Sequence, residues 1–266
     1  MRLSTAICAL TLASNGVFAS SAMASPLTIY PSTLGVSAIS GNMSTGAPGF
    51  GAGSFQESGN TKGEVYVSSV ALFGRQIRFS DIASVSYWTN KPGNAASVDW
   101  SFYIYTALTG TGDAGSFYHT RLVSEPLYNN TPAASVATNT WHQWASGGTN
   151  AMRFYDSARD GGIFGVNSDP TLATLEGGAY VWPSSSTSVD YRGELVNLFS
   201  LQTGSAWSAG FLGLVDGLTI TLTNGVTGTV NLEAAPGVVP EPESIALLGV
   251  GLVGMLAAAA RRKRTA

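Results

Sequence analysis

Residues 98–105 read VDWSFYIY, a stretch in which bulky apolar side chains alternate with more polar ones. Successive side chains of a β-strand point to opposite faces, so Trp100, Phe102 and Ile104 share one face. Tyr103 and Tyr105 share the other face. This alternation predicts a strand with one face in the core and the other nearer solvent.

Similar strand patterns recur along the chain between clusters of Gly, Pro, Asn and Ser. They cover residues 64–72, 76–79, 84–88, 117–123, 141–145, 152–155, 194–201, 211–214, 218–222 and 228–232. Many short strands and few helical patterns predict an all-β fold, a two-layer antiparallel β-sandwich of the jelly-roll or concanavalin-like kind, over residues 25–236. Residues 30–62, rich in Gly and Ser, are expected to form an irregular loop or a weak hairpin.

The best helix candidate begins at Pro170, directly after Asp169, and runs to residue 176. Asp169 is expected to be the N-cap and Pro170 the first helical residue, with Gly177 or Gly178 ending the helix. We expect this short helix to lie over an edge or end of the sandwich.

Composition excludes several classes of protein. Of 266 residues, 44% are hydrophobic and only 11% charged, which argues against a wholly disordered chain and against a coiled coil. Five of the 13 basic residues lie at the chain ends, which leaves eight against 16 acidic residues. We therefore expect no nucleic-acid partner.

The first 24 residues predict a secretory signal peptide. Arg2 precedes a mostly apolar run, and Ala22 and Ala24 are the small residues that signal peptidase requires before a cleavage site. The alternative is a first helix of the fold, but the segment lacks a polar face. Cys8, the single cysteine, would leave with the peptide, so the mature chain would have no disulfide and no cysteine site.

Residues 237–266 have three parts in a fixed order. Pro240, Glu241 and Pro242 precede an uncharged run at 245–260, and a basic cluster follows, formed by Arg261, Arg262, Lys263 and Arg264. A helix of this run would span about 24 Å, short of a hydrocarbon core of about 30 Å unless the arginines snorkel and the bilayer thins. We expect a membrane helix with its basic end in the cytoplasm; a buried core helix is the alternative.

This tail closely resembles the PEP-CTERM sorting signal of Gram-negative bacteria, and such tails are also classed with the C-terminal region of some ice-binding proteins. The resemblance implies export through the inner membrane and recognition by an exosortase, a membrane transpeptidase-like enzyme. It further implies transient anchoring, then delivery to the cell surface or to an extracellular polysaccharide matrix. It says nothing about what the rest of the chain does.

A second resemblance covers roughly residues 85–232. Residues 141–144, 154–155, 170–176 and 209–220, the last containing Val215-Asp216, look like a jelly-roll sandwich of exported PEP-CTERM proteins. That shape is similar to carbohydrate-binding and lectin-like sandwiches, and it brings no assigned activity.

No common catalytic motif is present, and His119 and His142 are the only histidines. We therefore expect no catalytic residues and no enzyme activity. Asp156 and Asp160 are weak calcium candidates in an Asp-Gly loop, but Ala158 replaces one ligand of an EF-type site and Asn167 another. No other metal or cofactor is expected, and the alternative for this loop is a turn with solvated charges.

Aromatic residues are the more promising binding feature, because sugar rings stack on Trp and Tyr while polar side chains bind their hydroxyls. The glycan-binding candidates are Tyr103, Tyr105, Trp141 and Trp144. Burial under a loop or second sheet is the alternative for the two tyrosines, and core packing is expected for the remaining tryptophans. Thr219, Thr221 and Thr223 alternate with apolar residues, but one threonine ladder is too little for an ice-binding face.

We therefore expect an exported, non-catalytic structural or adhesive protein of the cell surface or polysaccharide matrix, with weak glycan affinity. The alternative is a secreted glycan-active enzyme, similar to glycoside hydrolases, whose paired carboxylates come from separate strands.

Overall fold

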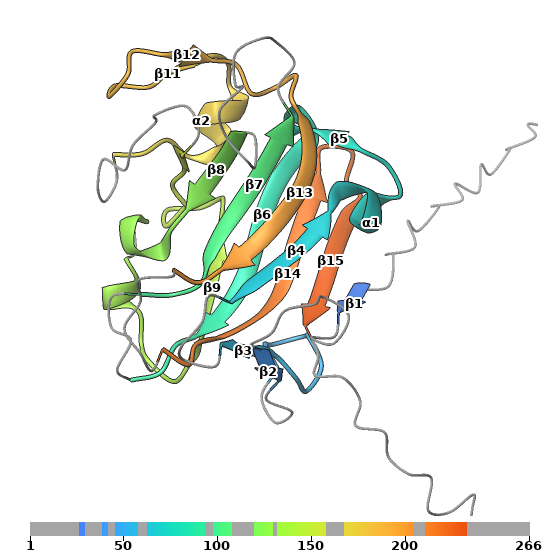
Figure 1. The fold of residues 1–266 in the computed structure, drawn as a ribbon, viewed down its shortest axis with the longest axis vertical. Helices are drawn as coiled ribbons and strands as arrows, with labels where there is room; N and C mark the ends of the chain where they lie inside the picture. Colours follow the sequence, from blue (N-terminus) through green and yellow to red (C-terminus); the bar gives the residue numbers. More distant parts are fainter. Residues whose placement is uncertain are drawn as a thin grey trace, which may run out of the picture.

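The computed structural model describes residues 27–29, 39–41, 46–57, 63–93, 98–107, 120–129, 132–157, 168–204 and 211–232. Two antiparallel sheets pack face to face in this part of the chain (Figure 1), so the predicted all-β sandwich is confirmed. The expected signal peptide, the tail helix, His119 and Asp160 lie outside the described residues.

One sheet has six strands, and β7, the strand predicted from VDWSFYIY, lies in its middle. The order is β10 (Tyr155–Asp156), β8 (Thr120–Ser124), β7 (Ser101–Ala107), β13 (Leu195–Gln202) and β4 (Glu64–Ser68), with β5 (Ile77–Arg78) also paired to β13.

The second sheet has seven strands and is centred on β14 (Leu214–Leu222). β14 pairs with β15 (Thr227–Leu232), β3 (Phe55–Glu57) and β6 (Ile82–Asn90). β1 (Leu27–Ile29) is parallel to β15, β2 (Ile39–Gly41) pairs with β3, and β9 (Trp141–Ala145) pairs with β6 at an edge. The β2–β3 pairing confirms a weak hairpin within residues 30–62.

Short elements cover the ends of the sandwich. They are α1 (Ser69–Phe73), α2 (Leu172–Glu176), the hairpin of β11 (Tyr180–Val181) and β12 (Ser188–Val189), and three 3-10 turns, η2 (Phe79–Asp81), η3 (Pro126–Tyr128) and η4 (Ala133–Ser135). Within the described ranges, no helix is long and apolar enough to cross a membrane.

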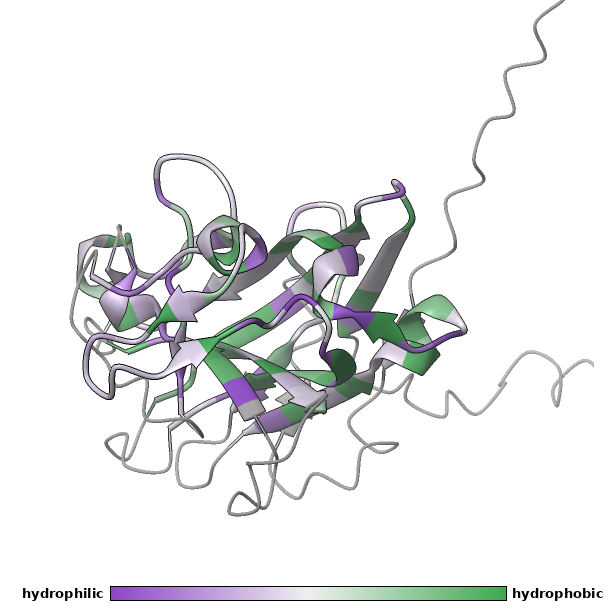
Figure 2. Cartoon of the chain, turned by 90° about the horizontal axis from the view of Figure 1, so that it is seen from above, coloured by the Kyte–Doolittle hydropathy of each residue, from purple (hydrophilic) through white to green (hydrophobic). Residues whose placement is uncertain are grey.

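The core forms where the two sheets face each other. Phe102 on β7 stacks on Phe199 of the neighbouring strand and on Tyr87 of the opposite sheet, each with 6.1 Å between ring centroids. Trp100 and Ile104 point the same way and are fully buried, as the alternation predicts. Figure 2 shows apolar residues, in green, along the strands of both sheets.

Three local predictions are wrong in detail. Residues 64–72 do not form one strand, because the Ser68 hydroxyl accepts a hydrogen bond from the Ala71 N–H and caps α1. The two strands predicted at 211–214 and 218–222 are one strand, β14. The helix at 172–176 is present, but Thr171 is its N-cap rather than Asp169.

The buried carboxylate of Asp216 joins three segments of the seven-stranded sheet. Its Oδ1 accepts hydrogen bonds from the backbone N–H groups of Gly217 at 2.7 Å and Leu232 at 2.9 Å. Its Oδ2 accepts one from the Ala47 N–H at 3.1 Å. Asp216 therefore fixes the loop before β3 and the end of β15 against β14.

Candidate functional site

The outer face of the six-stranded sheet carries a row of tyrosines. Residues directly opposite each other in neighbouring antiparallel strands share a face. Tyr103 lies opposite Val123 on one side and Ser200 on the other. Val123 in turn lies opposite Tyr155, and Ser200 opposite Tyr66. Five neighbouring strands thus bring three tyrosines into one row across the sheet.

Tyr105 extends this row into a contiguous aromatic surface. Its ring stacks on Tyr103 with 6.1 Å between centroids and packs at a tilt against Tyr66 at 6.3 Å. Tyr66, Tyr103 and Tyr155 are half-buried, whereas Tyr105 is only 2% exposed. We call Tyr66, Tyr103, Tyr105 and Tyr155, with the polar side chains among them, the outer tyrosine face.

Gln202 lies beneath the centre of this face. Its side-chain amide donates hydrogen bonds to the hydroxyls of Tyr105 at 2.8 Å and Ser200 at 2.9 Å, and a longer one to Tyr66 at 3.4 Å. The side chain is 1% exposed, and its Oε1 has no hydrogen-bond partner in the described part of the chain. An amide with an unpaired acceptor therefore lies directly under the tyrosines.

Charged groups border the face on the β8 side. The Arg121 guanidinium lies over the Tyr103 ring, 6.0 Å from its centroid, and donates to the Ser157 hydroxyl. The Tyr155 hydroxyl donates to Glu125 Oε1 at 2.5 Å. Burial and the nearby Glu125 carboxylate both raise the pKa of Tyr103 and that of Tyr155. Both phenols therefore stay protonated and can donate hydrogen bonds.

Two carboxylates, those of Glu64 and Glu125, lie on this face. Glu64 is opposite Gln202, which is opposite Ser101. Glu125 follows Ser124, the partner of Phe102, and so lies level with Ser101. The backbones of the two glutamates are three strand spacings apart, about 14 Å. Both carboxylates raise the pKa of Tyr103, which places that hydroxyl within the field of each.

The structure brings two of the four predicted glycan-binding residues together. Tyr103 and Tyr105 both lie on the outer tyrosine face, but the near-complete burial of Tyr105 makes it a support for the neighbouring rings. Sequence reasoning missed Tyr66, Tyr155 and Gln202. Only Tyr66 had a usable signal, because Glu64 and Tyr66 alternate with Val65 and Val67 in a strand pattern.

The other two candidates lie on β9 in the seven-stranded sheet. Trp144 is 1% exposed, and its indole N–H donates to the Thr89 hydroxyl at 2.8 Å, so its prediction as a surface glycan contact is wrong. Because β9 alternates, Trp144 points into the core opposite Tyr87. Trp141 is half-buried and lines an open pocket together with His142.

The calcium candidate Asp156 is fully buried rather than in a solvated turn. Its Oδ2 accepts a hydrogen bond at 2.7 Å from the Tyr191 hydroxyl, which itself accepts one from the Trp182 indole at 2.8 Å. No group of three or more His, Cys, Asp or Glu residues in the described ranges is placed to hold a metal ion. Asp156 therefore has a structural contact that the sequence did not indicate.

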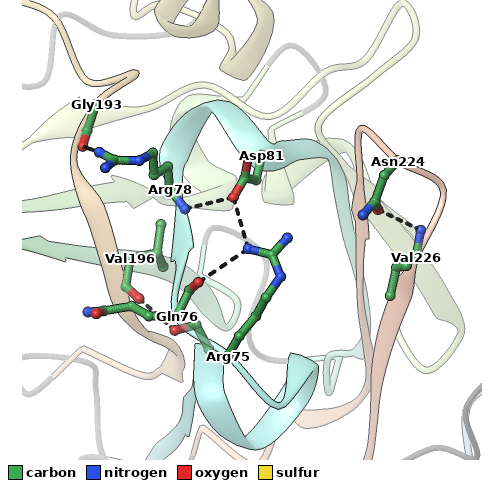
Figure 3. Close-up of polar contacts among 9 residues, drawn as sticks. Arg75, Gln76, Arg78, Asp81, Gly193, Val196, Asn224 and Val226 are labelled. Atoms are coloured by element: carbon green, nitrogen blue, oxygen red, sulfur yellow. Dashed lines mark hydrogen bonds and ion pairs between the residues drawn. The ribbon is translucent and has the colours of Figure 1, made fainter.

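A group of arginines lies where β5 meets β13 (Figure 3), and each has a partner there. Arg78 donates to the Gly193 carbonyl at 2.6 Å, and Arg75 pairs with Asp81 at 3.4 Å. Asp81 also accepts the Arg78 backbone N–H. These contacts fix the chain around η2, so the group is explained by structure without a ligand.

The threonines on β14 form two rows with β15 rather than one. Thr219 lies opposite Thr229 and Thr221 opposite Thr227, with 3.3 Å between the latter pair of hydroxyl oxygens. The register of β14 against β6 shifts on both sides of these threonines. Such irregularities bend and twist a strand locally, so these threonines do not form a regular flat array.

Comparison with known protein families assigns the tail alone. The PEP-CTERM protein-sorting motif matches residues 238–263, which confirms the expected sorting signal. The motif indicates an exported, surface-directed protein that an exosortase recognises and that is processed at the membrane. No curated protein and no solved structure matches the chain.

Proposed function

We propose that the sandwich is a non-catalytic adhesive module that holds a glycan on the outer tyrosine face at the surface of a Gram-negative cell. The observation that carries the proposal is the row of Tyr66, Tyr103 and Tyr155 across five strands, supported by Gln202. The sorting tail accounts for delivery, and the tyrosine face accounts for attachment to surface or matrix polysaccharide.

The chemistry of the face suits a sugar chain. Pyranose rings have apolar C–H faces that stack on aromatic rings, and their hydroxyls need both donors and acceptors. The Tyr103 hydroxyl donates, whereas the Tyr155 hydroxyl already donates to Glu125, and the Glu64 and Glu125 carboxylates accept. The tyrosines of the row lie on every second strand, about 10 Å apart, and this spacing favours an extended chain that contacts several strands.

Charge on the face favours a neutral glycan. Glu64 and Glu125 contribute two carboxylates, whereas Arg121 contributes one cation that already contacts Tyr103 and Ser157. An acidic polysaccharide would bring its carboxylates toward those two glutamates, and like charges repel. We therefore expect neutral polysaccharides to bind more tightly than uronic-acid polymers.

A glycan array with the full-length chain in a sugar-free zwitterionic detergent tests the proposal. Tyr103→Ala should weaken binding to neutral polysaccharides by about tenfold or more, the size of a typical aromatic hot spot. The matched control is Tyr180→Ala, because Tyr180 is also half-buried but belongs to β11 and packs on Trp182. Absence of binding across a broad panel, or equal binding by both variants, would refute the adhesive role.

A second candidate function, glycoside hydrolysis, is favoured by the two carboxylates of this face. Glycosidases place their paired carboxyl groups about 5–9.5 Å apart. The two backbones are farther apart than this, and Glu125 Oε1 is hydrogen-bonded to Tyr155 on the side away from Glu64, so catalysis would require the Glu125 side chain to turn toward Glu64. Release of reducing ends that is lost in both Glu64→Gln and Glu125→Gln would establish the enzyme and overturn the non-catalytic proposal.

The sorting step has its own test. Replacing Pro240, Glu241 and Pro242 by alanine should leave the unprocessed chain in the membrane fraction of an exosortase-producing Gram-negative host. The unchanged chain should be shortened and reach the surface. Because the sandwich is untouched, sugar binding by the variant should equal that of the unchanged protein.

A further inference from the structure

A second binding surface lies at the β9 edge of the seven-stranded sheet, away from the outer tyrosine face. An open pocket of about 320 Å³ is lined there by Ser135, Val136, Ala137, Thr140, Trp141 and His142. This volume is at the lower end of the range for small-molecule sites, enough for a ligand of one or two rings. β9 pairs only with β6 among the described strands, so this side of the strand is open.

Two aromatic residues of β9, Trp141 and His142, line the pocket and carry polar ring atoms. Neither the Trp141 indole N–H nor the His142 imidazole has a hydrogen-bond partner among the residues that the structure describes. The His142 ring is held in place by an edge-to-face contact with Trp144, 4.4 Å between centroids. Burial, and to a lesser extent the Lys91 charge, lower the pKa of His142, so the neutral ring has one donor and one acceptor.

The loop that forms the pocket wall is fixed by its own hydrogen bonds. Asn139 has a positive φ of 58° and donates its N–H to the Lys91 carbonyl at 2.8 Å. The Ser135 hydroxyl donates to the Pro132 carbonyl, and the Thr140 hydroxyl to the Thr138 carbonyl. Because both hydroxyl hydrogens are used, the two oxygens remain available as acceptors. The pocket is therefore largely formed before a ligand arrives.

We infer that this pocket binds a single neutral sugar residue, such as the end of a glycan chain. The indole face and the Val136 and Ala137 side chains suit the apolar C–H face of a pyranose ring. The ring nitrogens of Trp141 and His142 and the oxygens of Ser135 and Thr140 suit its hydroxyls. Apart from the neutral His142 imidazole, the lining residues that the structure describes carry no ionisable side chain, so a charged sugar would lose hydration without an ion partner.

A purely aromatic ligand fits the pocket less well. It could stack on Trp141, but it would leave the indole N–H and the imidazole without partners once water is excluded. Burying such groups unpaired costs free energy that a hydroxylated ring avoids. The polar groups therefore discriminate between a sugar and an aromatic compound of similar size.

Titration of tryptophan fluorescence with the methyl glycosides of glucose, galactose, mannose and N-acetylglucosamine tests the inference on the full-length chain in a sugar-free zwitterionic detergent. We expect saturable binding of at least one glycoside. Trp141→Ala should weaken it tenfold or more, with binding of this variant followed by calorimetry because it removes the reporter ring. Trp141→Phe should retain stacking but lose the indole hydrogen bond, giving an intermediate affinity.

Three controls make the outcome decisive. Gln143→Ala changes the next outward-facing residue of β9 outside the pocket lining and should bind like the unchanged protein. His142→Ala should weaken binding without lowering the thermal midpoint as a core substitution would. Tyr103→Ala should leave this site intact, so failure of the adhesive proposal is distinguishable from failure of this one. Absence of saturable binding by every glycoside, binding unchanged in Trp141→Ala, or preference for indole over all glycosides would overturn the inference.

Discussion

Replacing Asp216 by asparagine should destabilise the sandwich although the side-chain volume is kept. Asparagine can keep the two hydrogen bonds at Oδ1, from Gly217 and Leu232, but its amide N–H₂ would then face the Ala47 N–H. One charge-assisted bond is lost and one backbone donor is left without an acceptor, together about 2–4 kcal/mol. For a domain of this size, that corresponds to a fall in thermal midpoint of about 5–15 °C.

Thermal unfolding followed by near-ultraviolet circular dichroism measures the effect. The matched control is Asp190→Asn, because Asp190 pairs at 2.6 Å with Arg192 in an exposed ion pair that screening weakens. The control should unfold at the same midpoint as the unchanged protein. If the Asp216 variant and the control unfolded at the same midpoint, the Asp216 carboxylate would not be what holds the loop before β3, β14 and the end of β15 together.

Three further substitutions probe the same fold. Gly217→Ala should destabilise the protein more than Gly225→Ala. Both glycines have a positive φ, but only the new Cβ at position 217 would crowd a neighbour, 2.9 Å from Trp88 Cδ1. Urea unfolding of the two variants measures the difference, and equal midpoints would contradict the expected order. Burial raises the pKa of Asp99 from 3.8 to about 6, so the folded protein binds this proton more tightly than the unfolded chain does. The folded state therefore loses about 2 kcal/mol of stability as pH rises from 4 to 7. The Asp99→Asn variant should not show this loss. If the stability of the variant and that of the unchanged protein fell equally between pH 4 and 7, Asp99 would not be the cause of the pH dependence. Tyr191→Phe should lower the thermal midpoint, because it removes the hydroxyl that bonds both the buried Trp182 indole and the buried Asp156 carboxylate. An unchanged midpoint would show that water replaces this hydroxyl.

The alternation of VDWSFYIY was enough to predict the central strand and the direction of its side chains. Trp100, Phe102 and Ile104 enter the core as period-two geometry requires, because packing at the centre of a sheet allows one register only. The same rule gave Tyr103 and Tyr105 a common face. It could not give their exposure, which depends on neighbours from other strands.

The remaining partners of the site are set by strand order, which periodicity does not contain. Tyr66 and Tyr155 reach Tyr103 only because β4 and β10 belong to the same sheet as β7, although residues 66 and 155 are far apart in sequence. The burial of Asp156 has the same origin, since Tyr191 comes from a distant segment. Patterns within one segment predict a face, whereas a site needs the topology.

The two proposed sites belong to different sheets, and this arrangement has a consequence for adhesion. The outer tyrosine face lies on the six-stranded sheet, whereas the Trp141 pocket lies at the edge of the seven-stranded sheet, with the core between the sheets. A sandwich with both sites occupied would hold an extended glycan segment at one and a chain end at the other. Weak binding at each site would then combine, because the second contact forms at the high effective concentration set by the first. Loss of either site alone should therefore reduce attachment to a polysaccharide gel far more than it reduces binding of a short glycan at the site that remains.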